Sequence, residues 1–150
     1  MARPAYSYRQ DPDVPDFPDD RGVVVFDGDC VMCSRSARMV LERDRRGRFR
    51  VLAAQSALGR ALYRHYGLDD RDLSTFILIQ DGVASFKSDA VLRVTEQLGG
   101  IHCLAGLLRI IPRGLRDAGY DWVARNRLTF NRGRAVCALM PETDRTRILG

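Results

Sequence analysis

The chain of 150 residues contains one lysine, two histidines and four cysteines, and it has no long apolar run. A membrane-spanning helix needs about 20 consecutive apolar residues, and no segment approaches that length, so we expect no membrane association. The first ten residues lack the apolar core of a secretory signal peptide, which favours the cytoplasm. Four unevenly spaced cysteines are too few for the disulfide framework of a small secreted protein.

Lysine is scarce because arginine carries almost all of the positive charge. Of the 24 basic residues only Lys87 is a lysine, and the formal net charge is +5. The arginines are spread along the chain, with acidic residues between them on most segments. We therefore expect a solvated surface and no nucleic-acid partner.

The first 21 residues differ in composition from the rest of the chain. They are rich in proline and aspartate, and each X-Pro step disfavours helix and removes a backbone donor. We expect residues 1–21 to be an extended, largely disordered arm. A single domain over residues 22–140 and a tail over residues 141–150 follow it.

The domain alternates between strand and helix patterns. Runs of β-branched and apolar residues predict strands over 23–27, 49–53, 75–79 and 83–86. Apolar residues at helical spacing predict helices over 33–47, 57–66, 88–98, 103–111 and 115–126. Asp81-Gly82 predicts a tight hairpin turn, and Ser88 and Asp89 can cap the third helix. The order βαβ then ββα, with a helical C-terminal extension, indicates an α/β thioredoxin-like fold.

The stretch FDGDCVMC, residues 26–33, lies where the first expected strand meets the first helix. Unpaired backbone N–H groups at a helix N-terminus favour the thiolate, which is the nucleophile in disulfide exchange. We therefore expect Cys30 to be the exposed, attacking sulfur and Cys33, one turn later, to be the more buried, resolving one. Asp27 could cap the turn or relay a proton for Cys33, and Asp29 would oppose thiolate formation.

A zinc site is one alternative, in a non-catalytic metal-binding module. Tetrahedral zinc needs four ligands, usually supplied by two closely spaced pairs. The remaining candidate ligands, which form no second pair, are Cys103, Cys137, His65 and His102.

A phosphatase is the other alternative. A strand followed by Asp-x-Asp, here Asp27 and Asp29, resembles the first motif of haloacid-dehalogenase-type phosphatases. Those enzymes also need a downstream lysine and a later acidic pair that binds magnesium. Lys87 follows a hairpin strand, and Asp69-Asp70 precedes a strand instead of ending one, so the later motifs fit poorly.

Asp27, Gly28, Cys30 and Cys33 match, position by position, the D-G-x-C-x-x-C signature of the DCC family of thiol-disulfide oxidoreductases. The chain resembles this family over about residues 22–140, including SRSARMVLERDRRGRF after the cysteines, SDA at 88–90 and YDWVARNR at 120–127. The resemblance implies a thioredoxin-like fold and exchange with protein or low-molecular-weight disulfides. It implies no organic cofactor and no metal, because the sulfur pair carries the electrons, but it does imply an electron donor.

Thioredoxin-like enzymes usually place a cis-proline before the third strand, and this chain has Ser74 there. We expect a trans peptide bond before Ser74, since a cis bond before a non-proline residue costs about 2.5–4 kcal/mol. Ser74 should lie across the site from Cys30 and contact substrate, together with Gly28 and Asp29.

Four residues of the C-terminal part are also singled out by the sequence. Cys103, among leucines, is expected to be an inert core thiol, whereas Cys137 could be a third redox sulfur. Tyr120 and Trp122 are expected to pack the last helix onto the sheet.

Overall fold

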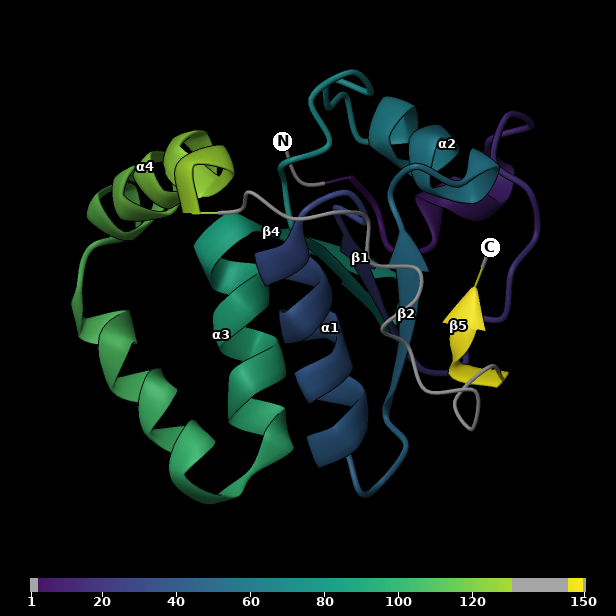
Figure 1. Ribbon diagram of the computed structural model, residues 1–150. Helices are drawn as coiled ribbons and strands as arrows, with labels where there is room; N and C mark the ends of the chain where they lie inside the picture. The colour runs from purple at the N-terminus through teal and green to yellow at the C-terminus, as the bar shows by residue number, and fades with distance from the viewer. Residues whose placement is uncertain (1–2, 131–145, 150) are drawn as a thin grey trace.

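The computed structural model describes residues 3–130 and 146–149, with the side chains of 101–103 and 127–130 left out of the description. A five-stranded mixed sheet with strand order β4-β3-β1-β2-β5 forms its centre (Figure 1). The strands are β1 (Gly22–Phe26), β2 (Phe49–Ala53), β3 (Ile77–Gln80), β4 (Val83–Phe86) and β5 (Ile148–Leu149).

Helices cover both faces of the sheet. The α-helices are α1 (Val31–Arg43), α2 (Ala57–His65), α3 (Lys87–Leu98) and α4 (Arg113–Phe130), and the 3-10 helices are η1 (Ser7–Gln10) and η2 (Gly100–Ile110). Figure 1 shows α1 and α3 side by side on one face of the sheet, with η2 and α4 beyond α3. This mixed α/β sheet with C-terminal helices confirms the expected fold class and is consistent with a thioredoxin-like fold.

Two apolar cores flank the sheet because side chains alternate between its faces along each strand. Val23 and Val25 of β1 pack in one cluster with Leu62 and Tyr63 of α2. Val24 and Phe26 belong to the other cluster, whose remaining buried members come from α1, α3 and the neighbouring strands. Every residue of β1 is buried, as its continuous apolar run predicts.

Three segments that are far apart in sequence meet at one end of the strands. β1 runs parallel to β2, with Val25 opposite Leu52, so both strands finish at this end of the sheet. β3 is antiparallel to β1, with Ile77 opposite Val25, so the segment before β3 starts there. The loop between β1 and α1, which ends at Cys30, therefore meets the residues after β2 and the residues before β3.

The hairpin between β3 and β4 has the geometry that its sequence predicts. Asp81 and Gly82 have φ values of 51° and 75°, and two consecutive positive φ angles are typical of the Asp-Gly type I′ turn. The predicted turn is thus confirmed.

The N-terminal segment differs from the disordered arm that its composition suggests. Tyr8 is 2% exposed, and it packs in the α2-side core with Val14 and Phe17. The Tyr8 hydroxyl donates a hydrogen bond to Asp19 Oδ2 at 2.6 Å. Three apolar anchors within a Pro- and Asp-rich segment thus pack residues 3–21 against the domain, together with polar contacts.

The start of α3 also differs from expectation. Phe86 occupies the cap position and supplies no side-chain hydrogen bond, and the helix begins at Lys87, whose φ is 51°. Ser88 and Asp89 lie within the first turn. The Ser88 hydroxyl donates to the carboxylate of Asp117 in α4, and Asp89 accepts from Arg93 at 2.9 Å. Ser88 thus contacts α4 and Asp89 contacts the next turn of α3, and neither side chain caps the start of α3.

The C-terminal part differs from the predictions made from the sequence in three places. Leu104, Leu107 and Leu108, the expected surroundings of a core thiol, are 49–63% exposed, and Trp122 is 57% exposed. These side chains do not pack onto the sheet because η2 and α4 lie outside α3 (Figure 1). The short strand β5, which pairs in parallel with β2, lies in the region expected to be a tail.

Candidate active site

The first cysteine caps the helix that carries the second. Cys30 is the N-cap of α1, and its Sγ accepts a hydrogen bond from the backbone N–H of Cys33 at 3.3 Å. The Cys30 carbonyl accepts from the N–H of Ser34 at 2.9 Å. The sequence placed Cys30 at the start of this helix, and the structure confirms that position. The Cys30 sulfur is therefore tied to the backbone of the first turn of α1.

The exposure of the two cysteines is the reverse of the expectation. Cys30 is only 2% exposed, whereas Cys33 is half-buried. The sulfur of Cys30 turns back to cap the helix, while Cys33 in the first turn faces a cavity between helices. Spacing along the sequence cannot show which way a capping side chain turns, so this part of the prediction is wrong.

Gln55, which the sequence did not single out, organises the loop between β1 and α1. Gln55 Nε2 donates to Asp27 Oδ1 at 2.6 Å and to Asp29 Oδ2 at 3.3 Å. Gln55 Oε1 accepts from the N–H of Gly28 at 2.8 Å. A Cβ at Gly28 would lie 2.9 Å from Gln55 Oε1, so a larger residue there would displace the Gln55 amide from this position. No local pattern marks Gln55, because parallel strand pairing alone brings it to the loop.

Asp27 is the buried carboxylate of the loop. It is 6% exposed, and its Oδ1 accepts the backbone N–H of Asp29 at 3.0 Å as well as the Gln55 amide. Asp29 itself is exposed. These bonds match the turn-capping role of Asp27, one of its two expected roles.

A neutral phenol lies close to this carboxylate. The Tyr63 hydroxyl donates to the Thr75 carbonyl at 2.5 Å. Burial raises the pKa of Tyr63, and the nearby Tyr120 and Asp27 raise it further. Tyr63 therefore stays protonated, and its hydroxyl holds the segment before β3 through the bond to the Thr75 carbonyl.

The segment before β3 is held by a tyrosine from α4. The Tyr120 hydroxyl donates to the Ser74 carbonyl and accepts from the Phe76 N–H, each at 2.9 Å. The described residues contain no cis peptide bond, so the expected trans bond before Ser74 is confirmed. Tyr120 was expected to pack the helix onto the sheet, and its hydroxyl in fact positions a loop at the site.

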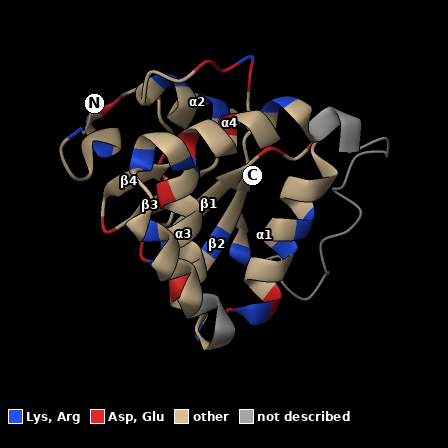
Figure 2. Cartoon of the chain, turned by 90° about the vertical axis from the view of Figure 1, so that its left-hand side faces the viewer, with Lys and Arg blue, Asp and Glu red and all other residues tan. Residues whose placement is uncertain are grey.

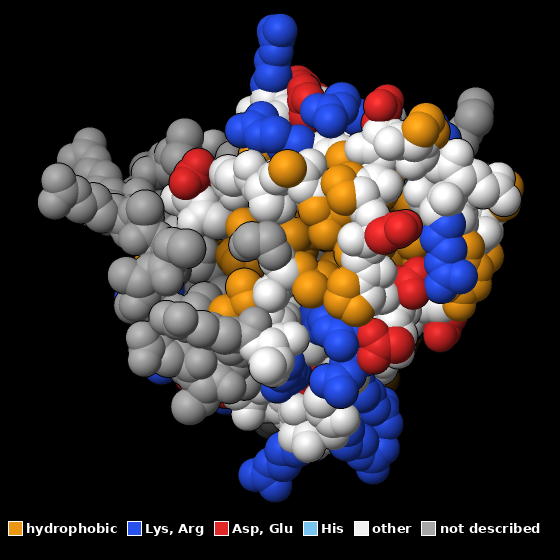
Figure 3. Space-filling view, turned by 90° about the vertical axis from the view of Figure 1, so that its right-hand side faces the viewer, with side chains coloured by type: hydrophobic (Ala, Val, Ile, Leu, Met, Phe, Trp, Pro, Cys, Tyr) orange, Lys and Arg blue, Asp and Glu red, His pale blue; other side chains and the backbone are white. Residues whose placement is uncertain are grey.

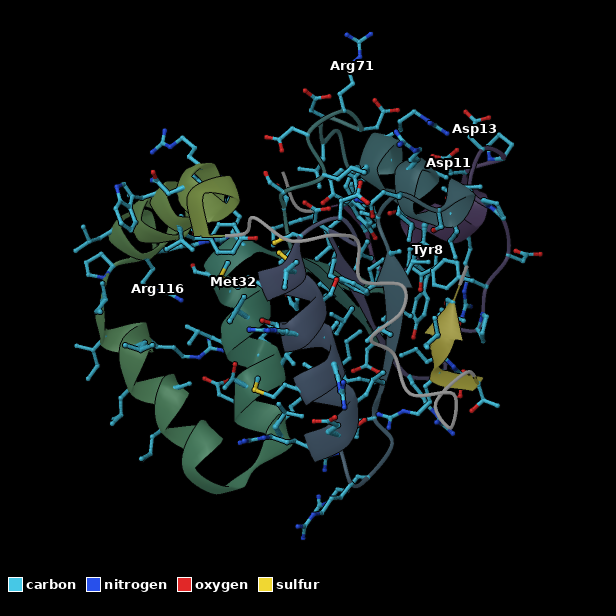
Figure 4. The ribbon with its side chains drawn as sticks, viewed as in Figure 1. Tyr8, Asp11, Asp13, Met32, Arg71 and Arg116 are labelled. Carbon is cyan, nitrogen blue, oxygen red and sulfur yellow. The ribbon has the colours of Figure 1, made fainter. Side chains whose placement is uncertain are left out.

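A cavity of about 190 Å³ opens beside Cys33, between α1, α3 and α4. Ser74 also lines it, which places Ser74 and Cys33 at one cavity. Met32, 38% exposed, extends from the start of α1 (Figure 4). The other lining residues are Ser36, Met39, Val40, Phe76, Val91, Val94, Thr95, Leu98, Tyr120, Val123 and Ala124. Gly28, Asp29 and Cys30 are not among them, so their contact with substrate stays a prediction.

Of the residues named for the two alternatives, Asp27 and Asp29 share the Gln55 amide, whereas His65 and Lys87 make separate contacts. Across the part of the chain that the structure describes, no group of three or more His, Cys, Asp or Glu is placed to hold a metal ion. His65 lies 2.6 Å from Asp11 and 2.9 Å from Ser7, both in the N-terminal segment. Lys87 pairs with Asp121 at 2.9 Å. Cys137 and the side chains of His102 and Cys103 lie outside the described residues.

Charged residues are distributed differently on two sides of the molecule. Basic and acidic residues are interspersed along the chain on the side that carries α3 and α4 (Figure 2), whereas on the opposite face basic side chains gather at the lower end of the view (Figure 3). Within residues 3–130 and 146–149, no helix is long and apolar enough to cross a membrane.

A family model described as DCC1-like thiol-disulfide oxidoreductase matches residues 24–133. The chain belongs to this family. Among its relatives, an uncharacterized protein of Bacillus subtilis strain 168, YuxK, is 30% identical over 85% of this chain and 93% of its own length. A chloroplastic DCC family protein of Arabidopsis thaliana is 33% identical over 73% of this chain and 64% of its own length. No solved structure matches.

Proposed function

We propose that the protein is a disulfide reductase that uses Cys30 and Cys33 as its redox pair. The observation that carries the proposal is the hydrogen bond from the Cys33 N–H to the Cys30 sulfur at the start of α1. Membership of the DCC1-like family supports the reaction class. We infer the direction, reduction of substrate disulfides, from a CxxC pair in a protein expected in the reducing cytoplasm.

The reaction proceeds in two exchange steps. The Cys30 thiolate attacks one sulfur of the substrate disulfide, which forms a mixed disulfide and releases one substrate thiolate. Cys33 loses its proton and attacks the Cys30 sulfur, which forms the Cys30–Cys33 disulfide and releases the second substrate thiolate. Two electrons pass from the cysteine pair to the substrate, and a thiol donor returns them. We assign the attack to Cys30, despite its burial, because the thiolate is the nucleophile and its sulfur receives the N–H.

The neighbouring residues have positioning and proton-transfer roles in this proposal. Asp27, the buried carboxylate of the loop, relays the proton that Cys33 loses. Gln55 holds Asp27 and the Gly28 backbone in place through the bonds described above. The substrate is flanked by Ser74, Gly28 and Asp29 at the end of the sheet where β1 finishes and β3 begins. The partners are a protein or low-molecular-weight disulfide and an electron donor, with no nucleic acid and no membrane, and the location is the cytoplasm.

Single cysteine variants test the proposal with insulin or hydroxyethyl disulfide as substrate and dithiothreitol as donor. We expect Cys30→Ser to abolish turnover. Cys33→Ser should also stop turnover but accumulate a mixed disulfide on Cys30, visible by mass spectrometry of a digest. Cys103→Ser is the matched control and should turn over normally.

Three outcomes would contradict the proposal. Normal turnover by Cys33→Ser would exclude the two-cysteine mechanism. An adduct trapped on Cys33 in Cys30→Ser, with none on Cys30 in Cys33→Ser, would reverse the assigned roles, as exposure alone would favour. Stoichiometric zinc that is lost when both cysteines are replaced would identify a metal-binding module instead.

A further inference from the structure

The cavity beside Cys33 has walls that offer a ligand little besides apolar surface. None of its lining residues is charged, and most are Met, Val, Leu, Phe or Ala. Its position against one sulfur of the redox pair means that a group bound there lies next to the exchanging disulfide.

Of the four hydroxyl-bearing residues in the walls, Ser36, Thr95 and Tyr120 have hydroxyl groups that are already bonded within the protein, and Ser74 is the fourth. Ser36 donates to the Met32 carbonyl at 2.9 Å, and Thr95 donates to the Val91 carbonyl. The Tyr120 hydroxyl both donates and accepts in the loop before β3. A polar or charged group that entered the cavity would lose its water and gain few new hydrogen bonds, which is unfavourable.

The size of the cavity selects a single side chain. An apolar cavity of about 150 Å³ stays dry and binds benzene, and this cavity measures about 190 Å³. It therefore accommodates a phenyl ring or a branched aliphatic side chain, but not the polar, multiply charged body of glutathione.

We infer that the substrate is a disulfide-bonded peptide segment in which a large apolar side chain next to the reacting cysteine fills this cavity. This inference rests on the proposed disulfide exchange and adds the class of substrate to it. The apolar side chain anchors the segment while the cysteine sulfur meets the redox pair. Burying a Phe or Leu side chain is expected to raise the exchange rate constant about 10- to 100-fold over that of a peptide with serine in its place.

The test compares two symmetric peptide disulfides that differ only in the residue after cysteine, phenylalanine or serine. The reduced protein is mixed with each peptide, and release of peptide thiol is followed by chromatography. Each rate constant is divided by that of the same peptide with dithiothreitol, which removes intrinsic differences. The expected ratio of phenylalanine to serine peptide is about 10 to 100, with oxidised glutathione as slow as the serine peptide.

Two variants of the cavity wall and one matched control locate the preference. Ala124→Phe fills the cavity from α4, and Val91→Asp places a carboxylate on the wall at a position that is 39% exposed and tolerates change. Both should bring the ratio close to 1. Ala118→Phe adds the same ring to an exposed site on α4 outside the cavity, and it should keep the ratio of the unaltered protein.

The outcomes separate this inference from the proposed function. Exchange with hydroxyethyl disulfide but a peptide ratio near 1 overturns the apolar anchor and leaves the reductase standing. A high ratio that persists in both Ala124→Phe and Val91→Asp also overturns it, because the anchor would lie elsewhere. No exchange with any disulfide removes the proposed function, and the anchor falls with it.

Discussion

At the scale of single residues, the amide of Gln55 ties two carboxylates and a backbone N–H into one network. We expect Gln55→Ala to lower the free energy of unfolding by about 1–3 kcal/mol, because buried groups of the loop would lose the hydrogen bonds of the Gln55 amide. Gln55→Glu should cost more at neutral pH, because a third carboxylate would face Asp27 and Asp29. Urea unfolding at pH 7 and pH 5 measures both changes.

The pH dependence separates repulsion from simple loss of contacts. The deficit of Gln55→Glu should shrink as the pH falls, since protonation removes the repulsion, whereas the deficit of Gln55→Ala should change little. Gln10→Ala, at an exposed position, is the control and should unfold like the unaltered protein. Equal stability of Gln55→Ala and the control would mean that the network contributes nothing.

Ser74 stands where related folds carry a proline, and its backbone is already held by Tyr120. We expect Ser74→Pro to change the alkylation rate of Cys30 by iodoacetamide more than it changes stability. The ring restricts φ at the loop facing the cysteines, and a compatible proline shifts stability by only about 0.4–1 kcal/mol. Alkylation kinetics and the urea midpoint are the measurements. Ser74→Ala separates loss of the hydroxyl from the effect of the ring, and an unchanged alkylation rate in both would remove Ser74 from the site.

At the scale of elements, the N-terminal segment is held on α2 by a polar contact as well as by its apolar anchors. His65 Nδ1 lies 2.6 Å from Asp11 Oδ2 (Figure 4 labels Asp11). This hydrogen bond holds the pKa of Asp11 below its ordinary value of 3.8. A carboxyl group with a lowered pKa stabilises the folded state above its ordinary pKa, and that stabilisation disappears as the pH falls through the lowered value. Attachment of the segment should therefore weaken below about pH 4.

Proteolysis at neutral pH tests the same contact. We expect Asp11→Asn to speed trypsin cleavage after Arg9 several-fold, because loss of the charged acceptor loosens the segment. Asp13→Asn, a neighbouring exposed carboxylate, is the control and should be cleaved at the original rate. Near-ultraviolet circular dichroism between pH 7 and pH 3 should show the tyrosine signal weakening only at the acid end. Equal cleavage of both variants would show that the apolar anchors alone hold the segment.

Most elements could be predicted because their signals are local. Helical and strand periodicities, Asp81-Gly82 and the position of Cys30 at a helix start all depend on residues close in sequence. The missed features depend on distant partners: Gln55 reaches the loop through strand pairing, and Tyr120 reaches Ser74 from α4. Tyr8 shows the same limit, since composition predicts disorder for a segment whose few apolar residues find a core to enter.

At the scale of the whole molecule, one ion pair joins the last described residues to the first half of the domain. Arg147 pairs with Asp44, whose side chain is 3% exposed, and also donates to the carbonyls of Phe49 at 3.1 Å and Leu41 at 3.2 Å. We expect Arg147→Met to cost about 3–5 kcal/mol of unfolding free energy, because a buried carboxylate would lose its cation. Urea unfolding measures this loss.

A double variant distinguishes an ion pair from a general effect of the substitution. Asp44→Asn combined with Arg147→Met should lose less than the sum of the two single changes, because the charge that each leaves behind is gone. Arg46→Met, at an exposed position, should have little effect. Strict additivity of the two changes would show that the pair is not coupled.

Trp122, the single tryptophan of the chain, stands 57% exposed on α4 and outside both cores. Its fluorescence therefore reports on α4 alone. We expect the emission to be red-shifted already in the native protein and to change little when the sheet unfolds. Tyr8 and Tyr63, each at most 2% exposed, report on the interior instead. Emission excited at two wavelengths can therefore time the detachment of α4, and with it the release of Ser74 by Tyr120, separately from the collapse of the sheet.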